Sequence, residues 1–315
     1  MLKSTLLKKT LLILTFFFIG ANNVQAIEIT RFFYMGDGIV SLKGQKIIFR
    51  NPDGTYRDAG LKQINQIFRS PWLPAEERLS LRFIEILDYV QDKLKGRTYS
   101  LRSGYRSPRG NQSLRKRGKL AAQSSMHVEA AAGDLTLNGV PSSQVFDFVK
   151  ALDCCGIGWY HSRHFHLDTG PSRYWSEKTS KTEDKRPQLN AKIIMQSDFD
   201  RYLPGERLPL KYMRVTNYPI GVPQIVQLVS TDQGSEFKPK NLTIQFPENT
   251  RVEDHCRILS SRKQARNLST TLPKKDLPAG KYALKISFCN RYDYETMPTE
   301  ILSRPFEITQ AVKGN

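Results

Sequence analysis

Hydrophobic residues between positions 59 and 94 are spaced as in amphipathic helices. Residues 59–69 predict a first helix, and a longer helix is predicted after Pro74, ending near Leu94. We expect Gly96 to close the longer helix as its C-cap. Residues 144–152 show the same spacing and predict a third helix.

Other segments alternate hydrophobic and polar residues, which is the pattern of half-buried strands. Residues 27–58 predict short strands or an extended N-terminal arm. Further strands are expected at residues 99–101 and 164–168, and residues 156–160 are expected to form a turn that leads into a strand. Together these elements predict an α+β domain over residues 27–175, in which helices pack on a small antiparallel sheet.

The pattern changes after residue 175. Residues 176–188 are charged, rich in serine and threonine and lacking in apolar residues, so we expect a linker there. Residues 189–315 contain short strand and turn patterns and no convincing helix, which predicts an Ig-like β-sandwich as a second domain.

The N-terminus has the features of an export signal. Lys3, Lys8 and Lys9 precede the apolar run of residues 11–20, and a small-x-small cleavage signal ends at Ala26. We expect residues 1–26 to be removed and the mature chain to be periplasmic or secreted, with an uncleaved anchor as the alternative. No later segment is apolar enough to predict a transmembrane helix.

Export permits disulfide bonds, and the chain has four cysteines. Cys256 and Cys289 both lie in the C-terminal third, and we expect them to pair. Cys154 and Cys155 are adjacent in sequence. Because a bond between adjacent cysteines is strained and rare, we expect two small buried thiols there, with a thiolate metal site as a weaker alternative.

The chain is strongly basic, with a formal net charge of +18. Removal of residues 1–26 takes away three lysines and no acidic residue, so the mature chain stays basic. This charge favours anionic partners. In an exported protein we expect no nucleic acid, and an anionic envelope polymer or membrane surface is the favoured partner.

Four of the five histidines lie in two short segments that also carry aspartates. The first segment contains His127 and Asp134, and the second contains His161, His164, His166 and Asp168. Strand alternation places His164, His166 and Asp168 on one face of their strand. Histidine with carboxylate suits zinc, and a catalytic zinc takes three protein ligands and keeps one position for water. The pattern therefore predicts a zinc hydrolase.

Several motifs occur in order between residues 59 and 175. They are Ser103-Gly104-Tyr105-Arg106-Ser107-Pro108, Asn111, Ser125-Met126-His127 with Asp134, Gly156-Ile157-Gly158-Trp159-Tyr160, Phe165-His166-Leu167-Asp168-Thr169-Gly170, Arg173 and Trp175. In these motifs the region resembles the MepK-type murein endopeptidases, which are relatives of the D-Ala-D-Ala metallopeptidases. The resemblance implies one Zn²⁺ and peptidoglycan as the substrate. It does not extend to the C-terminal region.

The resemblance also implies roles for individual residues. By position, His127, Asp134 and His166 are the implied zinc ligands. His164 is implied as the histidine that assists water or stabilises the tetrahedral intermediate, and His161 matches a second site histidine of some relatives, with an exposed loop histidine as the alternative.

Arg106 is implied to bind a substrate carboxylate or the oxyanion, with loop structuring as the alternative. Ser125 either binds substrate or fixes the ligand loop, and Asp168 either orients a ligand or caps a turn. The carboxypeptidase branch has a glutamate where this chain has Arg163, so the general base stays open, with Glu129 as a weak candidate.

The surroundings of these motifs allow two interpretations each. Eight basic residues and no acidic residue lie between positions 96 and 128, which indicates either a groove edge for anionic strands or a solvated loop. For Trp159, Tyr160, Tyr174 and Trp175 we expect core packing, with a substrate cleft as the alternative.

The sequence thus predicts an exported zinc endopeptidase that acts on peptidoglycan cross-links. The alternatives are a non-catalytic wall-binding module and a zinc peptidase for a non-murein peptide. The C-terminal domain is expected to bind wall, bind a protein partner or gate the cleft.

Overall fold

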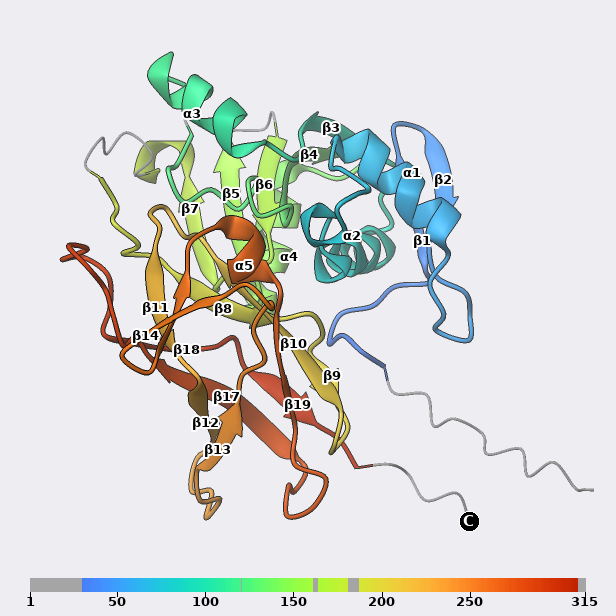
Figure 1. Cartoon of the computed structure of the whole chain (residues 1–315). Coiled ribbons are helices and arrows are strands. Elements are labelled where there is room, and N and C mark those ends of the chain that lie inside the picture. Colours follow the sequence, from blue (N-terminus) through green and yellow to red (C-terminus); the bar gives the residue numbers. More distant parts are fainter. Residues whose placement is uncertain (1–29, 120, 161–163, 181–186, 311–315) are drawn as a thin grey trace, which may run out of the picture.

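The computed structural model describes residues 30–119, 121–160, 164–180 and 187–310. The expected export signal and its cleavage site lie outside these residues. Figure 1 shows an upper part, which contains helices and a large sheet, and a lower part, which is rich in β-strands. Among the described residues, no helix has the length and hydrophobicity needed to cross a membrane.

The upper part is built on a seven-stranded sheet with the order β2-β1-β3-β4-β6-β5-β7. Neighbouring strands are antiparallel except for the pairs β1–β3 and β5–β7. The strands are β1 (Ile39–Leu42), β2 (Gln45–Ile48), β3 (Tyr99–Ser103), β4 (Ala132–Leu137), β5 (Gly156–Tyr160), β6 (His164–Asp168) and β7 (Arg173–Ser176). Residues 27–58 were expected to form short strands or an extended N-terminal arm; the short strands are confirmed, because β1 and β2 form a hairpin at one edge of this sheet.

The helices predicted from hydrophobic spacing are confirmed. They are α1 (Asp58–Phe68), α2 (Leu81–Leu94) and α4 (Ser142–Leu152), and the structure adds α3 (Pro108–Lys116) and the 3-10 helices η1 (Ala75–Glu77) and η2 (Glu177–Thr179). The expected C-cap is wrong by one residue, because Lys95 and not Gly96 has the left-handed conformation, with φ 53°. Gly96 serves close packing instead, since a Cβ atom there would lie 2.4 Å from Leu137 Cδ1.

The apolar sides of α1, α2 and α4 pack on one face of the sheet. Phe165 and Leu167 of β6 and Leu135 of β4 are fully buried in this core. Since side chains alternate along a strand, His166 and Asp134 face the other side of the sheet. The functional groups therefore lie on the face that the helical core leaves uncovered.

One carboxylate beneath the sheet is buried without full charge compensation. Asp88 on α2 is fully buried; its Oδ2 accepts a hydrogen bond from the Gly38 backbone N–H at 2.8 Å and lies 3.6 Å from Arg50. Burial raises the pKa of Asp88 to about 8, and the nearby carboxylates of Asp92 and Glu85 add to the rise.

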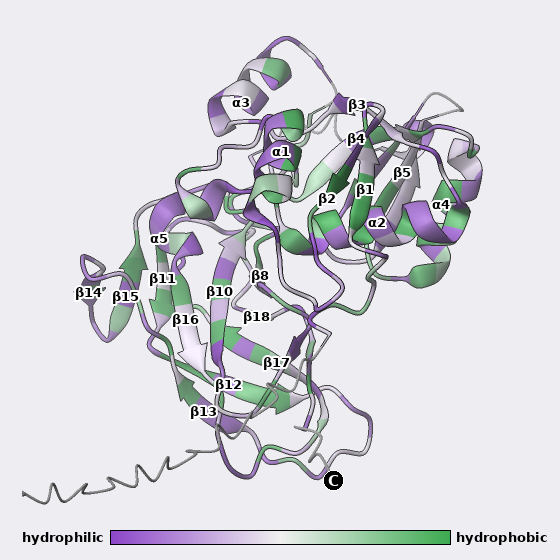
Figure 2. Cartoon of the chain, turned by 90° about the vertical axis from the view of Figure 1, so that its right-hand side faces the viewer, coloured by the Kyte–Doolittle hydropathy of each residue, from purple (hydrophilic) through white to green (hydrophobic). Residues whose placement is uncertain are grey.

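The region after residue 188 is β-rich. It contains β8 (Ile194–Ser197), β9 (Arg201–Tyr202), β10 (Arg207–Met213), β11 (Ile220–Pro223), β12 (Ile225–Ser230), β13 (Lys240–Thr243), β14 (Arg251–Glu253), β15 (Cys256–Leu259), β16 (Leu268–Thr271), β17 (Gly280–Ser287), β18 (Glu300–Leu302) and β19 (Phe306–Ile308). The main sheets run β16-β10-β8, β11-β15-β14 and β13-β12-β17-β19-β9, and residues from all three share one hydrophobic core. In Figure 2, hydrophobic residues recur along strands such as β12 and β17, whereas α3 is mostly hydrophilic.

This region also contains a helix that the sequence pattern did not predict. Helix α5 (Arg262–Arg266) is short, and three of its five residues are basic, so it shows no apolar periodicity. It begins at Ser261, whose hydroxyl accepts a hydrogen bond from the Gln264 backbone N–H at 3.3 Å. Figure 1 places α5 at the junction of the two parts.

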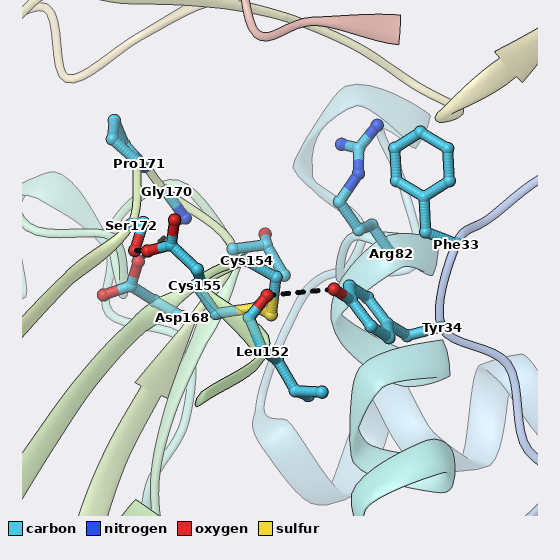
Figure 3. Close-up of a disulfide and its surroundings, with 12 residues drawn as sticks. Phe33, Tyr34, Arg82, Leu152, Cys154, Cys155, Asp168, Gly170, Pro171 and Ser172 are labelled. Carbon is cyan, nitrogen blue, oxygen red and sulfur yellow. Dashed lines mark hydrogen bonds between the residues drawn. A yellow bond between two sulfur atoms is a disulfide. The ribbon is translucent and has the colours of Figure 1, made fainter. Parts of the chain in front are cut away.

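The expected Cys256–Cys289 disulfide is present, with a Cα–Cα distance of 5.8 Å. The expectation of free thiols at Cys154 and Cys155 is wrong, because the two adjacent cysteines are bonded to each other where α4 gives way to β5 (Figure 3). Bonds between adjacent cysteines are rare in proteins in general, but this general frequency gives no information on the local turn, which here brings the two sulfurs together. Beside the bond, the Tyr34 hydroxyl donates to the Leu152 carbonyl at 3.0 Å (Figure 3).

The two parts are joined by buried polar contacts. Arg82 on α2 donates to Asp200 at 2.8 Å, and Gln196 on β8 donates to the Thr169 carbonyl at 2.9 Å. Met126 and Met213, one from each part, belong to a small shared apolar cluster. The segment just before β4 is thus enclosed between the sheet and the β-rich region.

Candidate active site

Three potential metal ligands meet on the polar face of the sheet. Asp134 on β4 and His166 on β6 are direct cross-strand partners, so the sheet register places their side chains together. His127 comes from the loop that leads into β4. Its Nε2 lies 3.2 Å from His166 Nδ1 and 3.3 Å from Asp134 Oδ1, and His166 Nδ1 lies 3.0 Å from Asp134 Oδ1.

The outer nitrogen of each histidine has a partner that fixes the tautomer. His127 Nδ1 lies 2.7 Å from the Gly104 carbonyl, which can only accept, so this nitrogen carries the proton. His166 Nε2 lies 2.7 Å from Asp168 Oδ2 and donates in the same way. With both rings neutral, the inner nitrogens would present lone pairs to each other and to a carboxylate oxygen, an arrangement that a bound cation would stabilise.

The donor set fits zinc. Tetrahedral zinc with ligand distances of about 2.0–2.1 Å places neighbouring ligand atoms about 3.3 Å apart, close to the separations in this site. The three residues form a candidate metal-binding group in the part of the chain that the structure describes. Two histidines and one carboxylate also match the ligands of known catalytic zinc sites.

The groups around Asp134 keep its carboxylate ionised. Arg106 donates from Nη2 to Asp134 Oδ2 at 2.9 Å and from Nε to the Ser103 hydroxyl at 3.0 Å. Burial alone raises the pKa of Asp134, but His127 and His166 outweigh burial and hold this pKa well below its usual range. Arg106 therefore lies at the site, beside a proposed ligand.

Asp168 makes the contacts that both of the roles left open by the sequence require, one to the His166 ring and one to the turn at Gly170. It is fully buried; besides His166, its carboxylate accepts from the Gly170 backbone N–H at 2.8 Å and from Arg173 Nη2 at 2.6 Å. Burial raises the pKa of Asp168, but the charge of Arg173 and the hydrogen bond from His166 outweigh it and keep the pKa below its usual range. The sequence had included Arg173 among the motifs without assigning it this function.

The Ser-Gly-Tyr-Arg motif holds His127 mainly through its backbone. Gly104 supplies the carbonyl for His127, and the Arg106 backbone N–H donates to the His127 carbonyl at 3.1 Å. A Cβ atom on Gly104 would lie 2.4 Å from the Phe68 carbonyl oxygen, so this close approach requires glycine. Carbonyl contacts of this kind could not be predicted from residue types.

The structure describes the surroundings of two further predicted site residues, His164 and Ser125. His164 is half-buried on β6, two positions before His166, and its ring stacks on Tyr160 with centroids 4.7 Å apart. His161 lies outside the described residues. Ser125 is buried, and its hydroxyl accepts from the His127 backbone N–H at 3.3 Å, which favours the loop-fixing alternative.

Two aromatic residues expected in the core lie beside the site instead. The ring centroids of Trp175 and His166 are 5.2 Å apart, and Trp175 Nε1 donates a hydrogen bond to the Tyr160 hydroxyl at 3.3 Å. Gly158 allows this approach, because a Cβ atom there would lie 2.5 Å from the Trp175 ring. Tyr174 is 60% exposed, so core packing is wrong for this residue as well.

Glu129 does not have the surroundings of a general base. It is buried, and its carboxylate pairs with Arg262 and Arg266 of the β-rich region. Burial raises its pKa, but these two arginines outweigh burial and lower the pKa below its usual value. The carboxylate is therefore held ionised in a structural contact.

Comparison with known proteins identifies the part of the chain that contains this site. Residues 40–175 match the family model described as Peptidoglycan L,D-endopeptidase MepK. Relatives with that name from Escherichia coli K12 and Shigella flexneri are 37% identical over 74 residues, which is 23% of this chain and 41% of each relative. The chain thus matches about two fifths of the length of these relatives. No solved structure matches it significantly. Residues 40–175, which contain all the described site residues, are thus similar in sequence to the MepK-type peptidases.

Proposed function

We propose that this chain is an exported, zinc-dependent endopeptidase that hydrolyses amide bonds in the peptide cross-links of peptidoglycan. The observation that carries the proposal is the convergence of His127, Asp134 and His166 with inner atoms 3.0–3.3 Å apart. The match of residues 40–175 to a peptidase family model, together with similarity to relatives named for peptidoglycan cleavage, supports the substrate class.

These three residues would hold one zinc ion. Zinc bound there supplies a Lewis acid for the scissile carbonyl and activates water near neutral pH. The chain's own groups prepare the site, because the Gly104 carbonyl and Asp168 hold the histidine protons on the outer nitrogens.

We assign the remaining roles from position and chemistry. Arg106, 2.9 Å from Asp134, supplies a positive charge beside the site for the developing oxyanion or a substrate carboxylate. His164 transfers protons on the accessible side, with His161 as its proposed assistant. Ser125 fixes the loop that carries His127, and substrate binding is its alternative role.

The basic surface supports an anionic polymer as substrate. Helix α3 follows the Ser-Gly-Tyr-Arg motif directly, and Asn111 ties it to the segment before His127 by donating to the Ala122 carbonyl at 2.9 Å. Arg109, Lys116, Arg117 and Lys119 on and after α3 are exposed. We propose that these basic residues attract peptidoglycan strands toward the site.

We also propose that residues 27–175 and 189–315 are separate domains joined by a linker at 176–188.

Digestion of purified peptidoglycan, resolved by mass spectrometry, tests this function. The mature protein should convert cross-linked muropeptides to smaller products, and chelation or His166→Ala should abolish the conversion. His255→Asn is the matched control, because His255 is an exposed histidine in a turn of the β-rich region with φ 66°, which asparagine tolerates.

Each outcome has a distinct meaning. Products that appear only with metal-loaded protein support the endopeptidase and identify the bond that is cleaved. A zinc-loaded protein that binds peptidoglycan but leaves every muropeptide intact would favour a wall-binding module. One that cleaves only free peptides would favour a different substrate.

A further inference from the structure

The loop that carries His127 is held from two sides. We define the ligand loop as residues 124–131, which lie between α3 and β4 and form turns rather than a helix or strand. Gly104 and Arg106 contact it from the peptidase sheet side, as described above. The β-rich region contacts it from the opposite side.

Glu129 is the centre of the second set of contacts. Its side chain is 3% exposed, and Arg262 Nη1 donates to its Oε2 at 3.1 Å. Arg266, whose side chain is 2% exposed, pairs with the same oxygen. The Arg214 backbone N–H donates to Oε1 at 2.8 Å. Both carboxylate oxygens are therefore bound by groups from the β-rich region.

The same region also binds the loop backbone through arginine side chains. Arg262 Nη2 donates to the Val128 carbonyl, one residue after His127. Arg214 donates from Nε to the Ser124 carbonyl at 3.2 Å and from Nη2 to the Ser124 hydroxyl at 3.3 Å. The loop is thus fixed at its start, at Val128 and at Glu129, on both sides of the ligand.

The arginines of α5 are themselves anchored to the peptidase part. Arg262 Nε donates to Glu77 Oε1 at 2.9 Å, and Arg266 Nη1 donates to the Glu76 carbonyl at 2.8 Å. Two arginines and two carboxylates, Glu77 and Glu129, therefore form a partly buried network in which the charges balance. In such a network, loss of one partner leaves a buried charge uncompensated.

We propose that the β-rich region is a positioning element of the metal site, and that Arg262, Arg266 and Arg214 fix His127 through Glu129 and the ligand loop. This inference rests on the proposed function, because it takes His127 as a zinc ligand. The sheet places Asp134 and His166 by their cross-strand register, whereas His127 depends on a loop. The three arginines supply the geometric constraint that the loop lacks by itself.

The test measures metal binding by the full mature chain, with Zn²⁺ affinity taken from competition with a chromophoric chelator. The Co²⁺ absorption spectrum reports the ligand geometry, and thermal unfolding of the metal-free protein reports stability. The variants are Glu129→Gln and Arg266→Met, with Arg266→Lys as the charge-conserving rescue. Arg82→Met is the matched control, because the Arg82–Asp200 pair is similarly buried at the same junction and does not touch the ligand loop.

We expect Glu129→Gln and Arg266→Met to weaken zinc affinity by about 10- to 100-fold and to alter the Co²⁺ spectrum, as is usual when support of a ligand is lost. Arg266→Lys should recover part of the affinity. Arg82→Met should lower the melting temperature and leave the zinc affinity unchanged.

Wild-type affinity and spectrum in Glu129→Gln and Arg266→Met would overturn the positioning role and leave the proposed function intact. An equal loss of affinity in Arg82→Met would also overturn it, because the effect would then be general destabilisation. A wild-type chain that binds no zinc would overturn the proposed function and the positioning role together. If Arg266→Met does not fold, Glu129→Gln and Arg266→Lys decide the question.

Discussion

Replacement of Asp168 by asparagine separates two roles of one buried carboxylate. Asp168 is fully buried and accepts hydrogen bonds from His166 Nε2, the Gly170 backbone N–H and both Nη atoms of Arg173. An asparagine side chain has nearly the same shape but no charge and one oxygen in place of two. Its single oxygen can accept a hydrogen bond from the Gly170 N–H or from His166 Nε2. It cannot accept both of these and also pair with Arg173.

The expected loss has two components. A hydrogen bond to a charged group contributes about 1.5–3 kcal/mol to stability. Because the Arg173 side chain is 33% exposed, water replaces part of its lost interaction, and we expect about 1–3 kcal/mol of destabilisation. Loss of the carboxylate behind His166 should weaken zinc affinity by about 10- to 100-fold, since such acceptors fix the tautomer and raise ligand basicity.

Two measurements on the same preparation test this reasoning. Chelator competition gives the zinc dissociation constant, and urea unfolding of the metal-free protein gives the stability change. Arg173→Met is the control for the ion pair alone, and it should lower stability with a smaller effect on zinc. If Asp168→Asn lowers stability but binds zinc as tightly as wild type, Asp168 only caps the turn, and the argument from tautomer control is refuted.

Three further changes have defined outcomes. Since the pKa of Asp88 lies near 8 rather than 3.8, the stability contributed by its protonated form is complete below pH 3.8 and is lost as the pH rises through about 8. Asp88→Asn should therefore reduce the fall in unfolding free energy between about pH 5 and 8.5, and an unchanged fall in urea titrations would contradict this. Gly104→Ala should lower both the melting temperature and the zinc affinity, because the alanine Cβ would lie 2.4 Å from a carbonyl oxygen. Gly110→Ala on α3 is the control and should change neither quantity by much. Equal behaviour of the two variants would count against the close approach at Gly104. Cys256→Ser with Cys289→Ser opens a loop of 33 residues and should reduce the free energy of urea unfolding by about 4 kcal/mol. An unchanged transition would show that the bond is not stabilising.

Sequence reasoning predicted best where a short-range pattern carries the information. Periodicity located α1, α2 and α4, because each helix buries one apolar side in the same core. Alternation along β6 put His166 and Asp168 on one face, and the structure joins them by a hydrogen bond of 2.7 Å. The candidate metal ligands His127, Asp134 and His166 came from a family resemblance, and the structure brings these residues together.

It failed where a contact depends on atoms that the motif does not specify. The backbone carbonyl of Gly104 looks the same in any residue type, so its hydrogen bond to His127 had no signal. Glu129 and Arg266 are 137 residues apart, and no local pattern indicates that they meet. The stacking of Tyr160 on His164 likewise depends on how β5 and β6 pair, and aromatic content alone favoured the core.

The two kinds of ligand placement give the β-rich region a role at the ligand loop, against which it packs. Asp134 and His166 need no external support, because neighbouring strands fix their backbones and the helical core fixes the opposite face. His127 has no such support from regular structure, and its loop would otherwise expose polar backbone groups and the Glu129 charge to water. Burial of that loop under Arg214, Arg262 and Arg266 replaces hydration with directed hydrogen bonds, which restrict the loop far more than water does. On this argument, the β-rich region affects zinc binding even if it never touches the substrate.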